Sequence, residues 1–318
     1  MSADAFIHLK SSKSLFSRNV VYENPNGIDG THSYSVRLTD EKLEWLRKDL
    51  ATVDKQTPVF VGMHVPLHKT PTLDDTGRTT TSYNMEDAER FVECLEGYDV
   101  NILTGHTHYN FNITKSERLR EHNIAAVCAT WWWTGHTDYA GNHICRDGSP
   151  GGYKIFEATG SDVRWYYKSI GKDAGYQFRT YDLNECLLEK SDFCPSASDS
   201  DFAKYAFGYD RANDNNEVLI NVFDWADDWK IEVTDLSDDS SLAVQRVRTH
   251  DPLHVISYNM RKLDKKSAMT FPTSYSAHMF KVKARTASSS LRIVVTDGFE
   301  NHYEQIMERP KALSFAME

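Results

Sequence analysis

The clearest pattern of hydrophobic and polar positions begins near residue 40. In the stretch DEKLEWLRKDLATV, apolar residues recur at helical spacing, at Leu43, Leu46, Leu50 and Val53. Acidic residues open the stretch, where the helix dipole favours negative charge. The pattern therefore predicts an amphipathic helix over residues 40–53.

Two short apolar runs end in histidine. PVFVGMH occupies residues 58–64 and DVNILTGHTH occupies residues 99–108, and each run is typical of a buried strand. A polar loop is expected over residues 68–84 and a second helix over residues 85–95. The order helix, strand, helix, strand predicts parallel crossovers, so both histidine groups are expected at the carboxyl ends of their strands.

Beyond residue 108 the chain becomes rich in predicted strands. YNFNIT, IAAVCATWWW, GYKIFEA and VRWYYKS suggest strands up to residue 182, whereas residues 183–216 are polar and irregular, as expected of a linker. From residue 217 onward, short alternating runs separated by turns predict a small antiparallel β-sandwich. The predicted fold class is α/β followed by a small all-β sandwich-like C-terminal domain, with domains at residues 1–182 and 217–318.

Composition narrows the class of protein. A chain of 318 residues is long enough for two ordinary domains, and its hydrophobic fraction of 40% fits a folded protein. The net charge of -10 argues against nonspecific nucleic-acid binding, because an acidic surface repels phosphate backbones. A local cluster of cations still allows a small phosphorylated substrate. The sequence shows no apolar run long enough for a membrane span, and its start lacks the apolar core of a signal peptide.

The five cysteines include no CxxC pair, which argues against a zinc knuckle or a thioredoxin-type motif. Cys186 and Cys194 are close enough in sequence to bridge a loop, and a pair of free thiols is an equal alternative. Cysteine usage therefore leaves the cellular compartment open.

Three histidines carry the strongest candidate chemistry. His64 lies in MHVPLH, and His106 and His108 lie in GHTH, directly after the predicted strands. Neutral imidazoles bind zinc, iron and manganese-type ions. Gly105 is expected to let the backbone turn sharply so that both following histidines face inward. HxH spacing is weak evidence by itself, but the strand ends and the upstream MHVPLH strengthen the interpretation as a metal site.

These motifs, in this order, resemble a known family. A strand ending in GMHVPLH, about forty residues, and a strand ending in GHTH are similar to the last two metal-binding blocks of the calcineurin-like metallophosphoesterases. The stretches AAVCATWWW, ICRDGSPGGYKIFEATGSDVRWYYK and DPLHVISYN resemble the members common in Bacteroidetes, which have a C-terminal β-domain. The resemblance covers roughly residues 34–310.

The resemblance implies a partial metallophosphatase α/β sandwich and a site with two divalent ions of the Mn, Fe or Zn class. In that family the ions polarise a phosphoryl oxygen and activate a water for attack on a phosphoric ester. His64 matches a ligand of the second metal, His106 matches a further ligand of the same metal, and His108 matches a ligand of the first metal. The implied partner is a phosphorylated substrate.

The upstream ligand blocks of the family are not found in residues 1–63. These blocks are Asp-x-His, Gly-Asp-x-x-Asp and Gly-Asn-His-Asp/Glu, and the last one supplies the histidine thought to protonate the leaving group. His8 and His32 lack an acidic partner at the required spacing. Gly141-Asn142-His143 follows GHTH instead of preceding it, and Ile144 replaces the acidic residue. We therefore expect an N-terminally truncated product with weak or partial metal occupancy, because carboxylates normally offset the repulsion between two dications.

Three other residues are candidates for contact with the substrate or with the metal ligands. Trp132, in the run Trp131-Trp132-Trp133, is suited to the wall of an apolar cleft, and alternation between core and surface explains the run equally well. Arg146 and Asp147 lie in the predicted loop ICRDG, and arginine is suited to bidentate phosphate contact. His68 is expected to be an ordinary loop residue.

Two functions remain open on the sequence. The first is a metal-dependent phosphoesterase of which this chain carries only part of the site, so that the chain as written need not be active. The second is a non-catalytic binding or structural module with a relic metal site and a ligand- or partner-binding β-domain. The sequence does not fix the substrate, the metal or the oligomeric state. Similar proteins often carry an export signal, so a periplasmic or cell-envelope location is expected for the intact parent.

Overall fold

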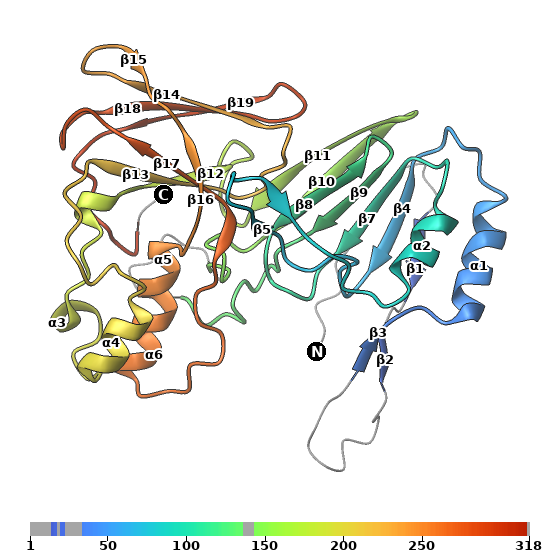
Figure 1. Ribbon diagram of the computed structural model, residues 1–318, viewed down its shortest axis with the longest axis horizontal. Helices are drawn as coiled ribbons and strands as arrows, with labels where there is room; N and C mark the ends of the chain where they lie inside the picture. Colours follow the sequence, from blue (N-terminus) through green and yellow to red (C-terminus); the bar gives the residue numbers. More distant parts are fainter. Residues whose placement is uncertain (1–13, 18–19, 23–33, 136–142, 317–318) are drawn as a thin grey trace.

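The computed structural model describes residues 14–17, 20–22, 34–135 and 143–316. His8, His32, Gly141 and Asn142, for which the sequence suggested no catalytic role, lie outside the described residues. Figure 1 shows an α/β part, a long two-stranded hairpin, and a strand-rich part that contains the second half of the chain.

A five-stranded sheet forms the α/β part, in the order β1-β4-β7-β9-β8. Four of its strands run parallel, namely β1 (Ser14–Ser17), β4 (Val59–Met63), β7 (Val100–Thr104) and β9 (Leu119–Asn123). The edge strand β8 (Phe111–Ser116) is antiparallel to β9. The two predicted strands that end in histidine are thus confirmed as β4 and β7, and they are neighbours.

Two helices cover this sheet. α1 (Asp40–Leu50) begins after Thr39, whose hydroxyl accepts a hydrogen bond from the backbone N–H of Lys42. α2 (Ala88–Cys94) is shorter than predicted. Leucines of α1 and Phe91 of α2 share one hydrophobic cluster with the apolar residues of β4 and β7. Burial of this helical face against the sheet fixes the two strands that carry the histidines.

The hairpin of β10 (Gly152–Thr159) and β11 (Asp162–Ser169) confirms two further predicted strands. The strand predicted for IAAVCATWWW is wrong, because residues 124–135 form a succession of turns. Ala129, Trp131 and Trp132 have φ angles of 48°, 49° and 64°, and a strand requires negative φ. Small apolar residues of this segment, such as Ala125 and Ala129, are buried although they lie in turns. The segment therefore has the composition of a buried strand but not the backbone of one.

The second half of the chain contains two four-stranded sheets. One sheet comprises β12 (Phe178–Asp182), β13 (Glu217–Val222), β17 (Ser276–Lys283) and β16 (Gln245–Thr249). The other comprises β15 (Ser240–Ser241), β14 (Lys230–Asp235), β18 (Leu291–Thr296) and β19 (His302–Met307). Alternate residues of β13, β17 and β18 meet in one hydrophobic cluster, so a strand-rich C-terminal part is confirmed.

Helical turns lie beside these sheets. Residues 183–216, predicted as a linker, contain α3 (Lys190–Phe193) and α4 (Asp199–Tyr205) and bury Leu188 and Cys194. They pack against a helical stretch over residues 252–264, which includes a π-helix at Val255–Met260 and was not predicted. Cys186 and Cys194 are free, so the disulfide alternative is wrong. No helix among the described residues is both long and apolar enough to cross a membrane.

Candidate metal centre

His64 and His106 meet at the carboxyl ends of two adjacent parallel strands. His64 follows β4 and His106 follows β7, and the backbone N–H of Gly105 donates to the carbonyl of His64 at 3.1 Å. The Nε2 atom of His64 lies 3.0 Å from the Nδ1 atom of His106. The two rings are nearly perpendicular, with centroids 4.9 Å apart. The predicted placement of these histidines at neighbouring strand ends is therefore confirmed.

The turn after β7 is made by the histidines themselves. His106 and His108 have φ angles of 67° and 58°, in the left-handed region that non-glycine residues rarely adopt. Gly105 is not among the residues with positive φ, and a Cβ placed on it would meet only ordinary contacts. The prediction that Gly105 makes the turn is therefore wrong. Strained backbone of this kind is concentrated at functional sites, because surrounding contacts must hold it.

His108 is held by the turn that contains the tryptophans. Its Nδ1 donates a hydrogen bond to the carbonyl of Ala129, and its ring stacks on Trp131 with centroids 4.0 Å apart. The Nε2 atom then carries the free lone pair, which is the form that ligates a metal. Burial lowers the pKa of His108, and the hydrogen bond to the carbonyl of Ala129 opposes this shift only in part.

The surroundings of His106 also favour its neutral form. Burial, followed by the nearby charges of His64 and His108, lowers the pKa of its imidazole. A metal binds only the deprotonated nitrogen, so a lowered pKa removes the competition between metal and proton near neutral pH. His106 and His108 thus both favour the neutral form at the end of β7.

The spacing of the two nitrogens is close to that around a shared ion. The 3.0 Å between His64 Nε2 and His106 Nδ1 is the length of a hydrogen bond between the two rings. Two imidazole nitrogens at ~2.0–2.1 Å from one tetrahedral ion lie about 3.3 Å apart, so a shared ion would require only a small separation of the rings. Among the residues that the structure describes, no group of three or more histidine, cysteine, aspartate or glutamate side chains is placed to hold an ion. The described residues thus bring two histidine nitrogens together and do not form a complete metal site.

Glu121, which the sequence did not single out, supports this site from β9. Its carboxylate accepts hydrogen bonds from the backbone N–H groups of Leu67 and His68 and from Nδ1 of His68. His68 is consequently a buried partner of Glu121 in the loop after His64. The sequence could have indicated this role, because Glu121 lies within a buried strand and a buried charge requires a partner.

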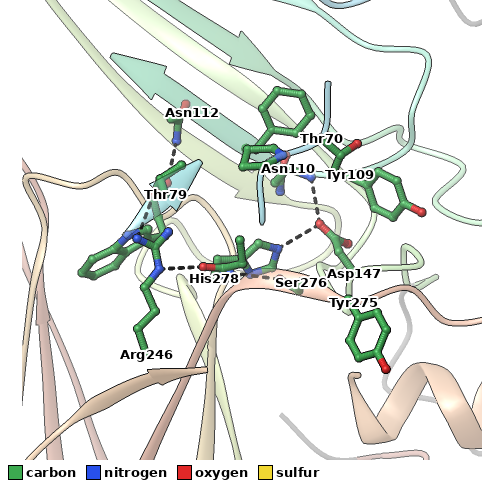
Figure 2. Close-up of a pocket in the computed structure, with 14 residues that line it drawn as sticks. Thr70, Thr79, Tyr109, Asn110, Asn112, Asp147, Arg246, Tyr275, Ser276 and His278 are labelled. Carbon is green, nitrogen blue, oxygen red and sulfur yellow. Dashed lines mark hydrogen bonds and ion pairs between the residues drawn. The ribbon is translucent and has the colours of Figure 1, made fainter. Parts of the chain in front are cut away.

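The carboxylate of Asp147 is hydrogen-bonded by neighbouring residues of the fold. It accepts from the backbone N–H of Asn110 at 2.8 Å and from the hydroxyl of Ser149, and it lies 3.1 Å from Nε2 of His278 on β17. Figure 2 shows Asp147 between Asn110 and His278, and all three residues line one pocket. Asp147 thereby joins the loop ICRDG to the C-terminal sheet.

Arg146 and Trp132 are more accessible than Asp147. The Nε atom of Arg146 donates to the carbonyl of Pro272 at 3.0 Å, and its guanidinium lies over the rings of Tyr109 and Phe271. Trp132 is 58% exposed and makes an edge contact with His143. His143 also lies 3.3 Å from the hydroxyl of Thr134. Contact of Arg146 and Trp132 with a ligand stays a prediction.

More than half of the chain matches a known family. The family model described as "C terminal of Calcineurin-like phosphoesterase" matches residues 121–303. The chain belongs to the calcineurin-like phosphoesterases. The match begins after His64, His106 and His108, so it identifies the family without testing the roles of these histidines.

The other comparisons found weaker likeness. The chain is similar to a dimetal phosphatase from Danio rerio at 21% sequence identity, over 28% of this chain and 27% of that chain, with a TM-score of 0.23. The chain thus spans about a quarter of that phosphatase, and a likeness this limited supports no argument about the site. No curated protein matches the chain.

Proposed function

We propose that this calcineurin-like phosphoesterase chain contributes histidine ligands to a divalent-metal site that hydrolyses phosphoric esters. The observation that supports the proposal is the 3.0 Å between His64 Nε2 and His106 Nδ1 at adjacent strand ends. His108 is the third proposed ligand, through Nε2, because its Nδ1 is bound to the carbonyl of Ala129. The proposed cofactors are two divalent ions of the Mn, Fe or Zn class.

The chemistry of the site is divided between the ions and the chain. A divalent ion would supply Lewis-acid polarisation of a phosphoryl oxygen and activation of a water. Glu121 fixes the loop that follows His64, and the carbonyl of Ala129 orients His108. Trp132 and Arg146 are proposed to contact the substrate, whereas Asp147 is proposed to position the loop that carries Arg146.

The domain division is also proposed. Residues 1–182 would form the C-terminal part of the catalytic domain, and residues 217–318 would form a β-sandwich domain. The shared hydrophobic cluster of the two four-stranded sheets supports the sandwich description. The buried residues of 183–216 support a close packing of this connecting segment on the second domain.

Metal binding tests the ligand assignment. Equilibrium dialysis against Mn²⁺ or Zn²⁺, followed by elemental analysis, would compare the 318-residue chain with the variants His64→Ala, His106→Ala and His108→Ala. His302→Ala is the matched control, because His302 is exposed on β19. We expect each of the three variants to lose metal while the control retains it. Unchanged metal binding in the His64 and His106 variants would show that the assignment is wrong.

Hydrolysis tests the activity. The metal-loaded chain would be assayed with 4-nitrophenyl phosphate and bis(4-nitrophenyl) phosphate in the presence of Mn²⁺. We expect slow turnover that disappears in the His106→Ala variant, since the described residues supply only part of the site. If neither ester is hydrolysed with any divalent ion, the hydrolase proposal fails for this chain and the alternative of a binding module is favoured.

A further inference from the structure

An aromatic strip lies beside the three histidines, and we define it as Trp131, Trp132, Trp133, Tyr258 and Phe271. Trp131 is stacked between His108 and Phe271, with ring centroids 4.0 Å and 3.9 Å away. Trp133 follows, 6.0 Å from Trp131 and 6.4 Å from Tyr258. The strip therefore starts at a proposed metal ligand and leads away from it.

Part of the strip has a strained backbone, and two of its indoles are exposed. Trp131 and Trp132 both have left-handed φ angles, and the turn is held by a hydrogen bond from the Trp132 N–H to the carbonyl of Cys128 at 2.8 Å. Arg261 donates to the carbonyl of Trp133 at 3.0 Å. The result is that Trp132 is 58% exposed and Trp133 is 41% exposed. Bulky residues adopt this backbone only where the surroundings enforce it, which is typical of a ligand site.

Cations accompany the aromatic rings. The guanidinium of Arg146 lies 5.7 Å from the ring of Phe271, and the Nζ atom of Lys262 lies 4.5 Å from the ring of Trp133. In the part of the chain that the structure describes, neither Arg146 nor Lys262 forms a salt bridge. The chain as a whole carries a net charge of -10. A local excess of cations on an acidic protein favours an anionic ligand at this position.

We propose that the aromatic strip binds the leaving group of the phosphoester, and that this leaving group carries a planar aromatic or heteroaromatic ring. The ring would stack on the exposed face of Trp132 or Trp133, because an indole offers a large, rigid surface to any flat ring. Arg146, whose guanidinium lies 5.7 Å from the ring of Phe271 in the same strip, would lie beside the phosphoryl group. Lys262 would contact an anionic oxygen of the same ligand. This inference rests on the proposed function, since it assigns the strip to the substrate of the histidine site.

Binding without metal tests the proposal separately from hydrolysis. The full 318-residue chain in EDTA would be titrated calorimetrically with AMP, with adenosine and with ribose 5-phosphate. AMP serves as the probe that has both ring and phosphate, and the other two compounds each lack one of these groups. We expect ribose 5-phosphate to bind at least ~10-fold more weakly than AMP, and adenosine to retain part of the affinity, because stacking dominates.

Variants of the aromatic strip test where the ring of the ligand stacks. Trp132→Ala or Trp133→Ala is expected to weaken AMP binding by about 5- to 150-fold, which corresponds to the loss of one stacked base. Trp132→Phe should retain most of the affinity, because a phenyl ring still stacks. Trp45→Ala is the matched control, because Trp45 is 46% exposed on α1, outside the strip. Lys262→Gln should reduce the preference for AMP over adenosine.

Three results would overturn the proposal. They are the absence of AMP binding, equal affinities for AMP and ribose 5-phosphate, and wild-type AMP affinity in both alanine variants of the strip. Failure of the proposed function has a different signature. In that case AMP binds through the tryptophans as expected, while the metal-loaded chain hydrolyses neither nitrophenyl ester, and the aromatic strip stands as a ligand site without the hydrolase.

Discussion

The Oε2 atom of Glu121 lies 2.6 Å from the Nδ1 atom of His68, and both side chains are buried. The same carboxylate accepts from the backbone N–H of Leu67 at 2.8 Å, and the hydroxyl of Thr104 lies 3.2 Å from its Oε1. Glu121 thus connects β9 with the loop after His64 and with the end of β7. A single carboxylate holds together the two segments that carry the proposed metal ligands.

Replacing Glu121 by glutamine tests this connection. Glutamine keeps the shape of the side chain but turns an NH₂ group toward backbone donors, so that a buried donor loses its acceptor. We expect the free energy of unfolding to fall by about 1–3 kcal/mol. We also expect metal affinity to fall, because the loop after His64 is less firmly held. Urea unfolding and equilibrium dialysis measure the two effects.

The control for Glu121→Gln is Glu117→Gln, which changes an exposed glutamate in the turn just before the same strand. It should leave both the unfolding free energy and the metal affinity unchanged. Wild-type stability in the Glu121→Gln variant would contradict the role given to the carboxylate.

A second prediction concerns a buried ion pair between the hairpin and the C-terminal sheets. The Nζ atom of Lys154 on β10 lies 2.7 Å from the Oδ1 atom of Asp224, and neither side chain is exposed. Lys154→Met leaves the carboxylate buried without its cation, so we expect the free energy of unfolding to fall by about 3–5 kcal/mol. The double variant Lys154→Met with Asp224→Leu should recover much of this loss, because both charges are gone.

Denaturant unfolding of the two variants measures the pair. The exposed pair of Arg292 and Glu304 on neighbouring strands provides the control, and removing it should change stability little, because solvent screens it. An equal effect of the Lys154 and Arg292 substitutions would contradict the prediction.

The sequence predicts the parts of the fold that local pattern determines. The continuous apolar runs of β4 and β7 identify buried parallel strands, and parallel strands place their carboxyl ends together, so the meeting of His64 and His106 was predictable. Their role as metal ligands stays a prediction.

Contacts between distant segments could not be predicted in this way. The run ending in three tryptophans has the composition of a strand, but its backbone follows from contacts with His108, Phe271 and Arg261, which are remote in sequence. Glu121 finds its partner 53 residues away, in the loop after His64. Periodicity describes which residues are buried, whereas such pairs depend on which segments the topology brings together.

Thiol reactivity provides a third prediction. All five cysteines are free, and Cys128 is half-buried while the other four are buried. Ellman's reagent should therefore modify one thiol in the native chain and five in denaturant, and Cys128→Ser should abolish the native reaction. Burial raises the pKa of the Cys128 thiol, so the native reaction should be faster at pH 9 than at pH 7. Recovery of only three thiols in denaturant would instead indicate a disulfide.

The fourth prediction concerns stability in acid. His250 is buried, and its ring stacks on Phe207 with centroids 3.7 Å apart and contacts Tyr275 at a tilt, with centroids 4.0 Å apart. Burial, helped by the charge of Arg248, lowers the pKa of His250 to about 4. An unfolded histidine titrates near 6.5, so between pH 6.5 and pH 4 the unfolded chain binds the additional proton. The contribution of His250 to stability is therefore fully present above pH 6.5 and is lost progressively as the pH falls toward 4.

The expected loss from this residue is roughly 3 kcal/mol over that range, at about 1.4 kcal/mol for each pH unit. His250→Phe keeps an aromatic ring between Phe207 and Tyr275 and removes the titration. Urea unfolding at several pH values should thus show a shallower fall in stability for this variant than for the wild type, with the difference confined to pH 4–6.5. The exposed His302, replaced by glutamine, serves as control and should follow the wild-type curve. Parallel curves for His250→Phe and wild type would show that protonation of this imidazole does not govern stability in acid.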